Sequence, residues 1–324
     1  MKESNLVSVI IPVYNRFDLA RRAIKSVILQ DYRPIEIIVI DDFSQNKFEF
    51  NDHIGVDDNV EISIIRNEVN LGPGGSREIG RKTSKGEFLV YLDSDDSYHP
   101  DFLKTMVSYL QDHPDIDMAY CHAKFMSSDG AYTDESVKRT FIKYDHILPH
   151  LIIDGRPWHS SGCIRRKRLT DKIGPWKPLN FWEDYEYDSR AGLANNRLGY
   201  IPDVLCYIDK DSEGKITRNP DTPRKNKSYG LSIYNIAKNL NGNENFMNDI
   251  RNRVIYHLLK SSARNLDNKS IEIAKNNVKE SLHWIKVHKR NYLILLLVAS
   301  LNFKIFSPIV SRVIRKMSNS YKFR

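Results

Sequence analysis

Residues 35–42 read Ile-Glu-Ile-Ile-Val-Ile-Asp-Asp, a short run of mostly β-branched residues that ends in two aspartates. This length and composition predict a strand that is buried on both faces, as the strands of parallel sheets are. Residues 7–13, Val-Ser-Val-Ile-Ile-Pro-Val, share this character, and further strands are predicted at 60–65 and 87–92. These strands favour a sheet as the centre of the fold.

Helical patterns separate the predicted strands. Apolar residues recur with helical spacing between Asn15 and Gln30, and a glycine-rich turn leads into a second helix predicted at 76–83. Strands that alternate with helices predict the α/β fold class, with a Rossmann-like, mostly parallel central sheet flanked by helices. Helical spacing returns over residues 231–290 and predicts a helical C-terminal extension.

Polar residues follow each predicted strand. The segments are Tyr14-Asn15, Asp41-Asp42, Arg66-Asn67 and residues 93–96, Asp-Ser-Asp-Asp. Parallel strands end at the same edge of a sheet, and open α/β sheets bind their ligands there. We therefore expect these separate segments to converge on one crevice.

The alternating carboxylates Asp93 and Asp95 suit a divalent cation. Residues i and i+2 of a strand point the same way, and hard cations prefer oxygen ligands. The other interpretation is a solvated turn in which Asp96 or Ser97 caps a helix predicted at 100–110. The position at a strand end, on the same edge as a second acidic pair, favours the metal site.

Two further segments of this edge have alternative interpretations. The pair Asp41-Asp42 can accept hydrogen bonds from a ribose or a base, but an Asx-type turn explains it equally well. Residues 71–75, Leu-Gly-Pro-Gly-Gly, precede a helix whose N-terminal amides, together with Arg77, could attract an anion. A plain turn fits this glycine-rich stretch as well.

Glu183 and Asp184 lie in an aromatic setting, residues 181–185. Burial beside aromatic rings raises the pKa of a carboxylate and makes it a better general base near neutral pH. Alternatively, both carboxylates complement the dipole at a helix N-terminus. No histidine is assigned to a metal site, because the one pair with helical spacing, His146 and His150, has a proline between its members.

These segments together resemble the inverting glycosyltransferases of family 2, which have the GT-A fold. The resemblance covers about residues 5–218 and depends on the order and spacing of its motifs, since each motif alone is common. The matching stretches are 7–15, 37–44, 70–72, 85–89, 92–96 and 182–184.

The resemblance implies roles for individual residues. Asp95 would hold Mn²⁺ or Mg²⁺, and Asp184 would be the catalytic general base, supported by Glu183. The residues that would bind the nucleotide-sugar are Pro12, Tyr14, Asn15, Asp41, Asp42, Arg77, Asp93 and Ser94. The acceptor hydroxyl would attack the donor directly and invert the anomeric carbon.

The sequence departs from the family pattern in one region. Members often carry a tyrosine-arginine and a histidine before a flexible segment, whereas residues 207–210 read Tyr-Ile-Asp-Lys here. With that arginine and histidine absent, Lys210, Lys215 or Arg218 would contact the diphosphate. The polar segment 210–227 is predicted to be a lid that orders over the donor.

The implied reaction moves a sugar from a nucleotide-sugar, a UDP-sugar by resemblance, to a hydroxyl of a glycan or lipid-linked glycan in cell-surface polysaccharide biosynthesis. The enzyme would be a hexosyl- or N-acetylhexosaminyl-transferase. The alternative is a non-catalytic nucleotide- or sugar-binding protein with the same fold, which the presence of Asp95 and Asp184 argues against. A sugar-phosphate nucleotidyltransferase would need a glycine-rich, arginine-containing loop after the first strand, where Pro12-Val13-Tyr14 stand instead.

Charge is distributed unevenly along the chain. The formal net charge is +8, yet residues 238–324 alone hold 17 Lys and Arg against 5 Asp and Glu. This asymmetry predicts a GT-A domain over residues 1–228 and a basic helical region over residues 229–324. Nucleic acid is not an expected partner, because the basic residues belong to no recognisable nucleic-acid-binding module.

Residues 291–310 are strongly apolar and have cationic flanks, which suits an interfacial helix on an anionic membrane. We expect peripheral membrane contact through 291–316, with a helix packed on the catalytic domain, or an oligomer interface, as the alternatives. No apolar run reaches the length of a membrane span, and the three separated cysteines are expected to be reduced thiols. These features predict a cytoplasmic protein, located at the cytoplasmic face of the membrane if the tail binds there.

Overall fold

The computed structural model describes residues 5–51, 58–127, 129–210, 222–267, 270–284 and 303–321. Most of the predicted lid at 210–227, and residues 291–302 of the predicted membrane-contacting segment, lie outside this part of the chain. The chain forms two compact units. The sheet unit comprises residues 1–147, 156–178 and 194–215, and the helical unit comprises residues 148–155, 179–193 and 216–324.

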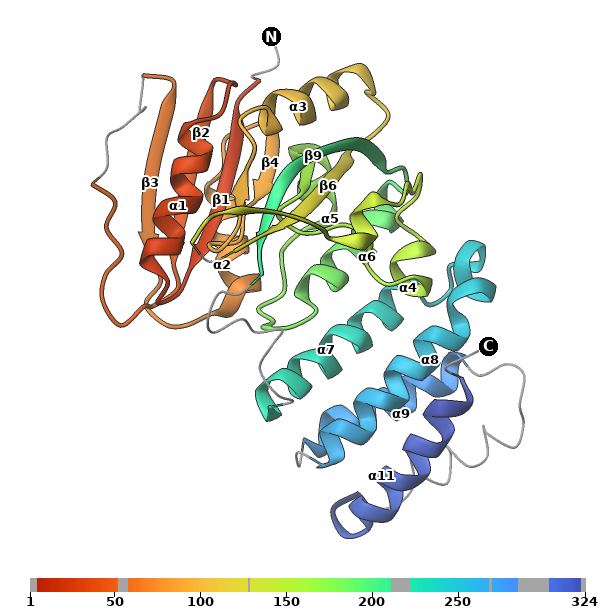
Figure 1. Ribbon diagram of the computed structural model, residues 1–324. Helices are drawn as coiled ribbons and strands as arrows, with labels where there is room; N and C mark the ends of the chain where they lie inside the picture. Colours follow the sequence, from red (N-terminus) through yellow and green to blue (C-terminus); the bar gives the residue numbers. More distant parts are fainter. Residues whose placement is uncertain are drawn as a thin grey trace. The chain divides into compact units, whose positions relative to one another are not determined.

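A nine-stranded sheet forms the centre of the sheet unit (Figure 1). Its strands lie in the order β3-β2-β1-β4-β8-β6-β9-β5, with β7 paired to β6. Their bounds are β1 (Val7–Val13), β2 (Ile35–Asp41), β3 (Val60–Arg66), β4 (Phe88–Tyr91), β5 (Ser97–Tyr98), β6 (Met118–Met126), β7 (Tyr132–Ser136), β8 (Cys163–Arg166) and β9 (Gly199–Asp209). Strands β1 to β4 pair in parallel, as do β6 and β9, whereas β5, β7 and β8 run antiparallel to their neighbours.

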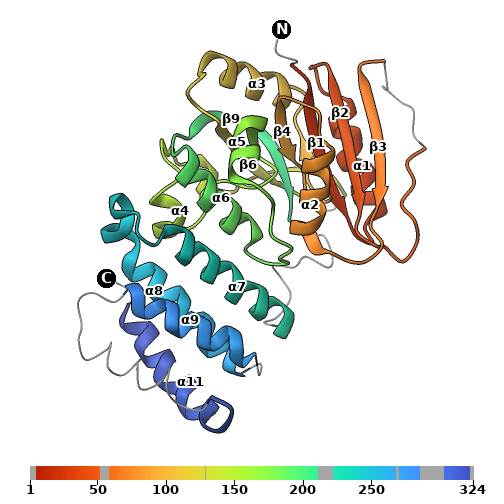
Figure 2. The same cartoon turned by 180° about the vertical axis from the view of Figure 1, so that it is seen from behind.

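Helices cover both faces of this sheet, as predicted (Figures 1 and 2). The helices of the unit are α1 (Phe17–Ile28), α2 (Gly72–Thr83), α3 (Phe102–Asp112), α5 (Lys167–Ile173) and the 3₁₀ turn η1 (Lys138–Phe141). Val9 and Ile11 of β1 belong to the core that α1 and α3 cover. Ile10 points to the opposite face, where α2 approaches so closely that a Cβ on Gly80 would lie 2.3 Å from Ile10 Cγ2.

The carboxyl ends of β1, β2 and β3 meet at one edge of the sheet. Val13 pairs with Asp41, and Asp41 pairs with Arg66. The backbone continues this alignment past the strands, because the Asp42 amide donates to the Val13 carbonyl and the Asn67 amide donates to the Asp41 carbonyl, each at 2.8 Å. The predicted convergence of the strand-end segments is therefore confirmed.

The helical unit is built from packed helices, which Figure 1 draws in blue-green to blue beyond residue 222. Its helices are α4 (His150–Ile153), α6 (Glu183–Ala194), α7 (Pro223–Leu240), α8 (Glu244–Asp267), α9 (Ile271–Trp284) and α11 (Phe303–Ser320). Ile250, Val254 and Leu258 of α8 are buried, as their helical spacing predicts. Buried amides add to the packing, since Asn265 Nδ2 donates to the Asn226 carbonyl of α7 at 2.9 Å.

Helix α11 packs within the helical unit. Its residues Val310 and Ile314 are buried, and Ser318 Oγ donates to the Tyr256 carbonyl of α8 at 3.4 Å. This packing accounts for part of the apolar stripe in the predicted membrane-contacting segment, and membrane contact by the remainder stays a prediction. Among the described residues, no helix is both long enough and apolar enough to span a bilayer.

Candidate active site

An acidic turn follows β4. The Asp96 amide donates to the Asp93 carbonyl at 3.0 Å. The hydroxyl of Ser161 holds both ends of the turn, because Oγ accepts from the Asp93 amide at 3.2 Å and donates to Asp96 Oδ2 at 2.6 Å. The Asp209 amide donates to the other Asp96 oxygen at 3.2 Å. The Asp96 carboxylate is thus buried and held in place from two other segments.

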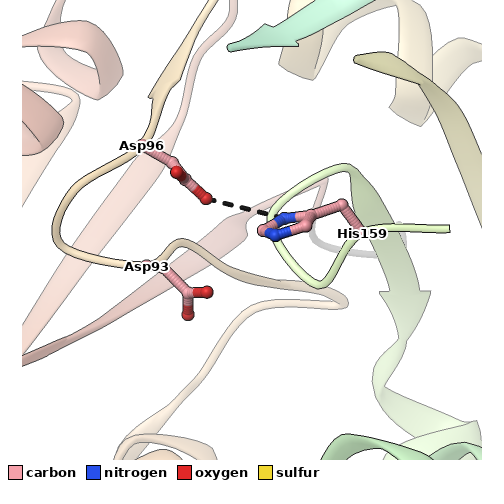
Figure 3. Close-up of side chains that lie close together, drawn as sticks. All are labelled: Asp93, Asp96 and His159. Atoms are coloured by element: carbon pink, nitrogen blue, oxygen red, sulfur yellow. Dashed lines mark ion pairs between the residues drawn. The ribbon is translucent and has the colours of Figure 1, made fainter. Parts of the chain in front are cut away.

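Asp93 and Asp96 share their surroundings with a histidine. One ligand atom from each of Asp93, Asp96 and His159 lies within 4.8 Å of the others (Figure 3). His159 Nδ1 is 3.5 Å from Asp96 Oδ2. Carboxylate oxygens suit Mn²⁺ and Mg²⁺, and imidazole is a ligand of transition metals, so this mixed donor set fits Mn²⁺ better than Mg²⁺. No histidine is assigned to a metal site from the sequence, so the position of His159 beside these carboxylates was not predicted.

Asp95, the predicted metal ligand, contacts arginines in this structure. Its Oδ2 accepts a hydrogen bond from Arg16 Nη1 at 3.0 Å, and its carbonyl accepts one from Arg22 Nη2 at 2.9 Å. Arg22 also pairs with the buried carboxylate of Asp209 at 2.7 Å. Asp95 therefore lies beside the acidic group that could hold a cation, and its role as a ligand remains a prediction.

Arg77 of α2 contacts the same turn. Its Nη2 lies 2.7 Å from Asp93 Oδ1, and its guanidinium lies 5.1 Å from the ring centroid of Trp176. Burial raises the pKa of Asp93, but the positive charge of Arg77, with contributions from His159 and Arg156, lowers it below the ordinary value. Asp93 is therefore an anion at neutral pH.

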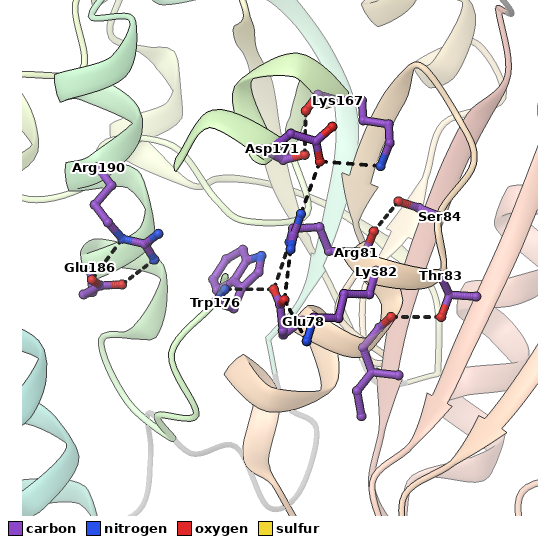
Figure 4. A network of polar contacts seen from close by, with 12 residues as sticks. Glu78, Arg81, Lys82, Thr83, Ser84, Lys167, Asp171, Trp176, Glu186 and Arg190 are labelled. Carbon is purple, nitrogen blue, oxygen red and sulfur yellow. Dashed lines mark hydrogen bonds and ion pairs between the residues drawn. The ribbon is translucent and has the colours of Figure 1, made fainter. Parts of the chain in front are cut away.

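A polar network ties the segment that carries Trp176 to α2 (Figure 4). Glu78 Oε2 accepts from Arg81 Nε at 2.8 Å and from the Trp176 amide at 3.0 Å. Arg81 in turn reaches Asp171 on α5 at 3.2 Å. The network therefore joins α2, the helix that carries Arg77, to α5 and to the segment whose Trp176 ring lies beside the Arg77 guanidinium.

The carboxylate of Asp41 accepts hydrogen bonds from the loop that follows β2 and from Arg66. Its Oδ1 accepts from the Ser44 amide at 2.9 Å, and its Oδ2 accepts from the Phe48 amide at 3.2 Å and from Arg66 Nη1 at 2.6 Å. Burial raises the pKa of Asp41, but the hydrogen bonds from Ser44 and Phe48 and the charge of Arg66 lower it further than burial raises it. These contacts fit the Asx-type turn interpretation.

Asp42 organises the glycine-rich stretch. Its Oδ1 accepts from Asn67 Nδ2 and from the Leu71 amide, and its Oδ2 accepts from the Gly72 amide, each at 2.8 Å. A carboxylate at the N-terminus of α2 also complements the helix dipole. Residues 72–75 form the first turn of α2, so the helix begins earlier than the predicted 76–83, and the amides of Leu71 and Gly72 at its start are bonded to a carboxylate of the chain itself.

The loops after β1 and β2 are tied to each other. The Asn15 amide donates to Ser44 Oγ at 3.0 Å, and the Gln45 amide donates to Asn15 Oδ1 at 2.8 Å. Asn15 and Phe43 both have positive φ, 55° and 64°, a conformation that costs free energy for residues other than glycine. The side chains of Tyr14 and Phe43 are each 49% exposed, so both aromatic rings are partly accessible at the strand-end edge of the sheet.

Two further predicted nucleotide-sugar contacts lie at the same edge. Pro12 is part-buried near the end of β1, and Ser94 is buried within the acidic turn. The structure thus brings the predicted nucleotide-sugar residues together on the strand ends of the sheet unit. Their contacts with a nucleotide remain predictions.

Glu183 and Asp184 begin α6 in the helical unit. Glu183 is buried and Asp184 is half-buried. The preceding residue, Trp182, has a φ of 61° and stacks on Tyr185 with ring centroids 4.3 Å apart. The predicted aromatic setting is therefore present, and both carboxylates also stand where they complement the helix dipole.

The chain that leads into α6 is held by α7. Ser228 Oγ accepts from the amides of Asn180 and Phe181 at 2.9 and 3.0 Å. Ser232 Oγ donates to the Phe181 carbonyl at 3.0 Å. Neither serine was expected from the sequence, because nothing in the pattern of a basic C-terminal helix indicates contact with the predicted base.

Known proteins resemble this chain in sequence and in structure. Residues 8–174 match the model of glycosyl transferase family 2. The chain is 33% identical over 111 residues to the putative colanic acid biosynthesis glycosyl transferase WcaA of Escherichia coli, which covers 34% of this chain and 40% of that protein. The matched region spans less than two thirds of such curated relatives, 60% and 40% of the length of two of them.

Solved structures show the same fold over nearly the whole chain. S. aureus TarS 1–349 in complex with UDP-GlcNAc has a TM-score of 0.59 at 18% identity, covering 98% of this chain and 93% of that one. The mannosyltransferase PcManGT from Pyrobaculum calidifontis, in complex with GDP-Man and Mn²⁺, has a TM-score of 0.54 at 13% identity, covering 100% and 89%. The fold is therefore GT-A. Since the family match spans just over half of the chain and includes the acidic turn after β4, the chain belongs to glycosyl transferase family 2 and is a glycosyltransferase.

Proposed function

We propose that this enzyme transfers a hexosyl or N-acetylhexosaminyl group from a UDP-sugar to a hydroxyl of a glycan or lipid-linked glycan, with inversion, in cell-surface polysaccharide biosynthesis. The observation that carries the proposal is the acidic turn at 93–96, which stands at the end of β4 beside Arg77 and His159. The names of two similar proteins support the substrate class: WcaA is a putative colanic acid biosynthesis enzyme, and TarS was solved with UDP-GlcNAc.

The proposed mechanism assigns a role to each group. Tyr14 and the loops that follow β1 and β2 would bind the nucleoside, while Arg77 would meet the diphosphate beside Asp93. A divalent cation, bound by Asp95 or by the group of Asp93, Asp96 and His159, would supply positive charge that offsets the charge of the leaving nucleoside diphosphate.

Asp184 would act as the general base, supported by Glu183. Its carboxylate would take the proton from the acceptor hydroxyl, and the acceptor oxygen would attack the anomeric carbon. The new glycosidic bond would form as the bond to the phosphate oxygen breaks. Attack from the face opposite the leaving group inverts the anomeric carbon.

The test incubates the purified full chain and Mn²⁺ with a panel of nucleotide-sugars and acceptor glycans, and measures nucleoside diphosphate release. We expect a UDP-sugar to be turned over, and Asp184→Asn to lower kcat by about 10²–10⁴-fold. Asp145→Asn, at a carboxylate whose side chain is 67% exposed, is the matched control and should keep full activity. Unchanged turnover in Asp184→Asn would refute the base assignment, and nucleotide-sugar binding without any turnover would indicate the non-catalytic alternative.

The proposal places the reaction in the cytoplasm, at the membrane face if the acceptor is lipid-linked. The three cysteines are free and buried, which fits a reducing compartment. Co-sedimentation of the full chain with anionic and with zwitterionic vesicles tests the predicted contact through 291–316. Binding that requires anionic lipid and weakens with salt is the expected result, and absence of binding to both vesicles would remove this part of the proposal.

A further inference from the structure

A hollow of about 350 Å³ lies in the sheet unit, with His159 in its wall. Its lining comes from β6, β7, the η1 turn and the loop at 156–159. This volume is near the lower end of the range for ligand pockets, about 300–1,000 Å³, which suits one sugar residue better than a long chain. None of the residues assigned to the nucleotide-sugar lines it.

The lining is positively charged. Arg139 of η1 is exposed and makes no ion pair with any residue that the structure describes. Arg156 is only 8% exposed, so its charge is held at the wall and away from bulk water. Glu135, the one carboxylate among the described lining residues, is paired with Lys210. An anion that enters the hollow would therefore meet two guanidinium groups and no unpaired carboxylate.

Aromatic rings form part of the same wall. Trp158 lines the hollow, its ring is 5.9 Å from that of Tyr120, and the guanidinium of Arg156 lies 6.0 Å from the Trp158 centroid. Phe125 adds a second lining ring. Flat apolar surface beside fixed polar groups suits a ligand with both an apolar face and a charged substituent. A sugar that carries an acidic group has this chemistry.

The hollow adjoins the acidic turn. His159 belongs to its wall, and Nδ1 of this histidine is 3.5 Å from Asp96 Oδ2. Figure 3 shows this ion pair at the acidic turn. A ring nitrogen of His159 lies within 4.8 Å of an Asp93 carboxylate oxygen, and Arg77 of α2 lies 2.7 Å from the same carboxylate. The hollow and Arg77 thus both adjoin the acidic turn. Arg77 is assigned to the donor nucleotide and His159 to the metal site, which leaves the hollow lined by Arg139 and Arg156 for a second substrate.

We propose that this hollow binds an acidic sugar residue of the acceptor, with its phosphate or carboxylate paired to Arg139 and Arg156. Guanidinium groups bind both kinds of anion through paired hydrogen bonds. Binding of the anion is a property of the hollow alone, whereas its assignment to the acceptor rests on the proposed function.

The direct test measures binding of three monosaccharides to the full chain by ligand-observed NMR, without nucleotide. The probes are glucuronate, glucose 6-phosphate and uncharged glucose, so the comparison also distinguishes a carboxylate from a phosphate. We expect at least one acidic probe to bind and to lose about tenfold in affinity in Arg139→Ala, with partial retention in Arg139→Lys. Arg197→Ala, at a surface arginine paired with Asp115, is the matched control and should leave binding unchanged.

Equal binding of glucose and both acids, or unchanged affinity in Arg139→Ala, would overturn the proposal. A parallel titration with UDP and Mn²⁺ tests the binding of acidic sugars in the hollow independently of the proposed function. Arg139→Ala should bind UDP like the wild type, and an acidic probe should not displace UDP. Displacement of UDP would assign the hollow to the donor and overturn the acceptor role. If no nucleotide-sugar is turned over, the proposed function and the acceptor role fail, while probe binding still decides whether the hollow takes acidic sugars.

Discussion

The indole ring of Trp182 lies 4.7 Å from the ring of Tyr229, centroid to centroid, with an angle of 85° between their planes. The Tyr229 hydroxyl is hydrogen-bonded to Nδ1 of His257 on α8 at 2.7 Å. Trp182 has a positive φ and directly precedes Glu183, so its strained backbone is held by side chains of the C-terminal helices. The helical unit therefore fixes the start of α6, where the proposed base stands.

Tyr229→Phe should destabilise the helical unit. The variant removes the hydrogen-bond partner of Nδ1 of the half-buried His257, which costs about 0.5–1.5 kcal/mol. Urea unfolding measures this loss, with Tyr234→Phe in the same helix as control, since its hydroxyl has no bond to His257. Equal stability of the two variants would show that the Tyr229 hydrogen bond contributes nothing.

His257 should make stability depend on pH. Burial, with the charges of Lys260 and Arg253, lowers the pKa of His257 to about 3. An unfolded histidine titrates near pH ~6.5, so below that pH the unfolded state takes up a proton that the folded state does not. The free energy of unfolding should therefore be greatest above about pH 6.5. It should decrease as the pH falls toward 3, by up to about 1.4 kcal/mol per pH unit.

The measurement is urea unfolding between about pH 7.5 and pH 5.5 for the wild type and His257→Gln. The variant should show a shallower decrease, because it has no imidazole to protonate on unfolding. His113→Gln, at an exposed position, should keep the wild-type slope. Parallel slopes in all three proteins would contradict the prediction that His257 is neutral in the folded state.

Asp42→Asn should loosen the start of α2. An amide oxygen can replace one carboxylate oxygen, but the NH₂ group would face a backbone amide that now donates to Asp42. We expect a loss of about 1–3 kcal/mol and weaker UDP binding. Asp101→Asn, at a carboxylate that is 50% exposed, is the control. Weaker UDP binding at unchanged stability would instead indicate a direct nucleotide contact.

Mn²⁺ binding with and without nucleotide can show whether Asp95 or the group of Asp93, Asp96 and His159 holds the metal. In the structure Asp95 is paired with Arg16, whereas Asp96 lies with Asp93 and His159. Asp96→Asn and His159→Ala should therefore weaken Mn²⁺ binding tenfold or more, as ligand losses do, while Asp95→Asn has little effect. With UDP present, the diphosphate can compete for Arg16, and Asp95→Asn should then weaken Mn²⁺ binding as well.

Isothermal titration with Mn²⁺, with and without UDP, measures these affinities. Thermal unfolding of each variant checks that the fold is intact. If Asp95→Asn strongly weakens Mn²⁺ binding in the absence of nucleotide, the prediction that Asp96 and His159 bind the ion there is wrong. Unchanged binding in His159→Ala would exclude the histidine as a ligand.

Gly80→Ala should destabilise the sheet unit, because the new Cβ would lie 2.3 Å from Ile10 Cγ2. Overpacking of this kind costs about 1–3 kcal/mol. Gly162→Ala is a matched control, since its nearest new contact would be an ordinary 3.6 Å to Cys121 Sγ. Chemical denaturation of both variants makes the comparison, and equal stabilities would show that α2 can shift away from β1.

Much of the sheet and its acidic edge can be predicted from local sequence. Val7–Val13 and Ile35–Asp41 form strands where runs of β-branched residues predict them, because such residues pack well in a buried pleated sheet. Once these strands are parallel, their polar ends must share an edge. The position of Asp93 beside the ends of β1 and β2 follows from this pattern alone.

The partners of the acidic turn could not be predicted in the same way. His159 and Ser161 approach it because β8 pairs with β4 and β6, antiparallel to both. No local pattern in the loop before β8 specifies that pairing. Ser228 and Tyr229 are equally unexpected, since their contacts with the start of α6 depend on how α7 packs.

The sequence by itself determined the α/β class, the acidic edge and the family, because these depend on patterns within short segments and on their order. Only the tertiary structure decided how each carboxylate is used. Asp42 binds amides at the N-terminus of α2, Asp95 pairs with Arg16, and Asp96 lies beside His159. The physical reason is that the role of a carboxylate depends on the donors around it, and those donors come from segments far apart in the chain.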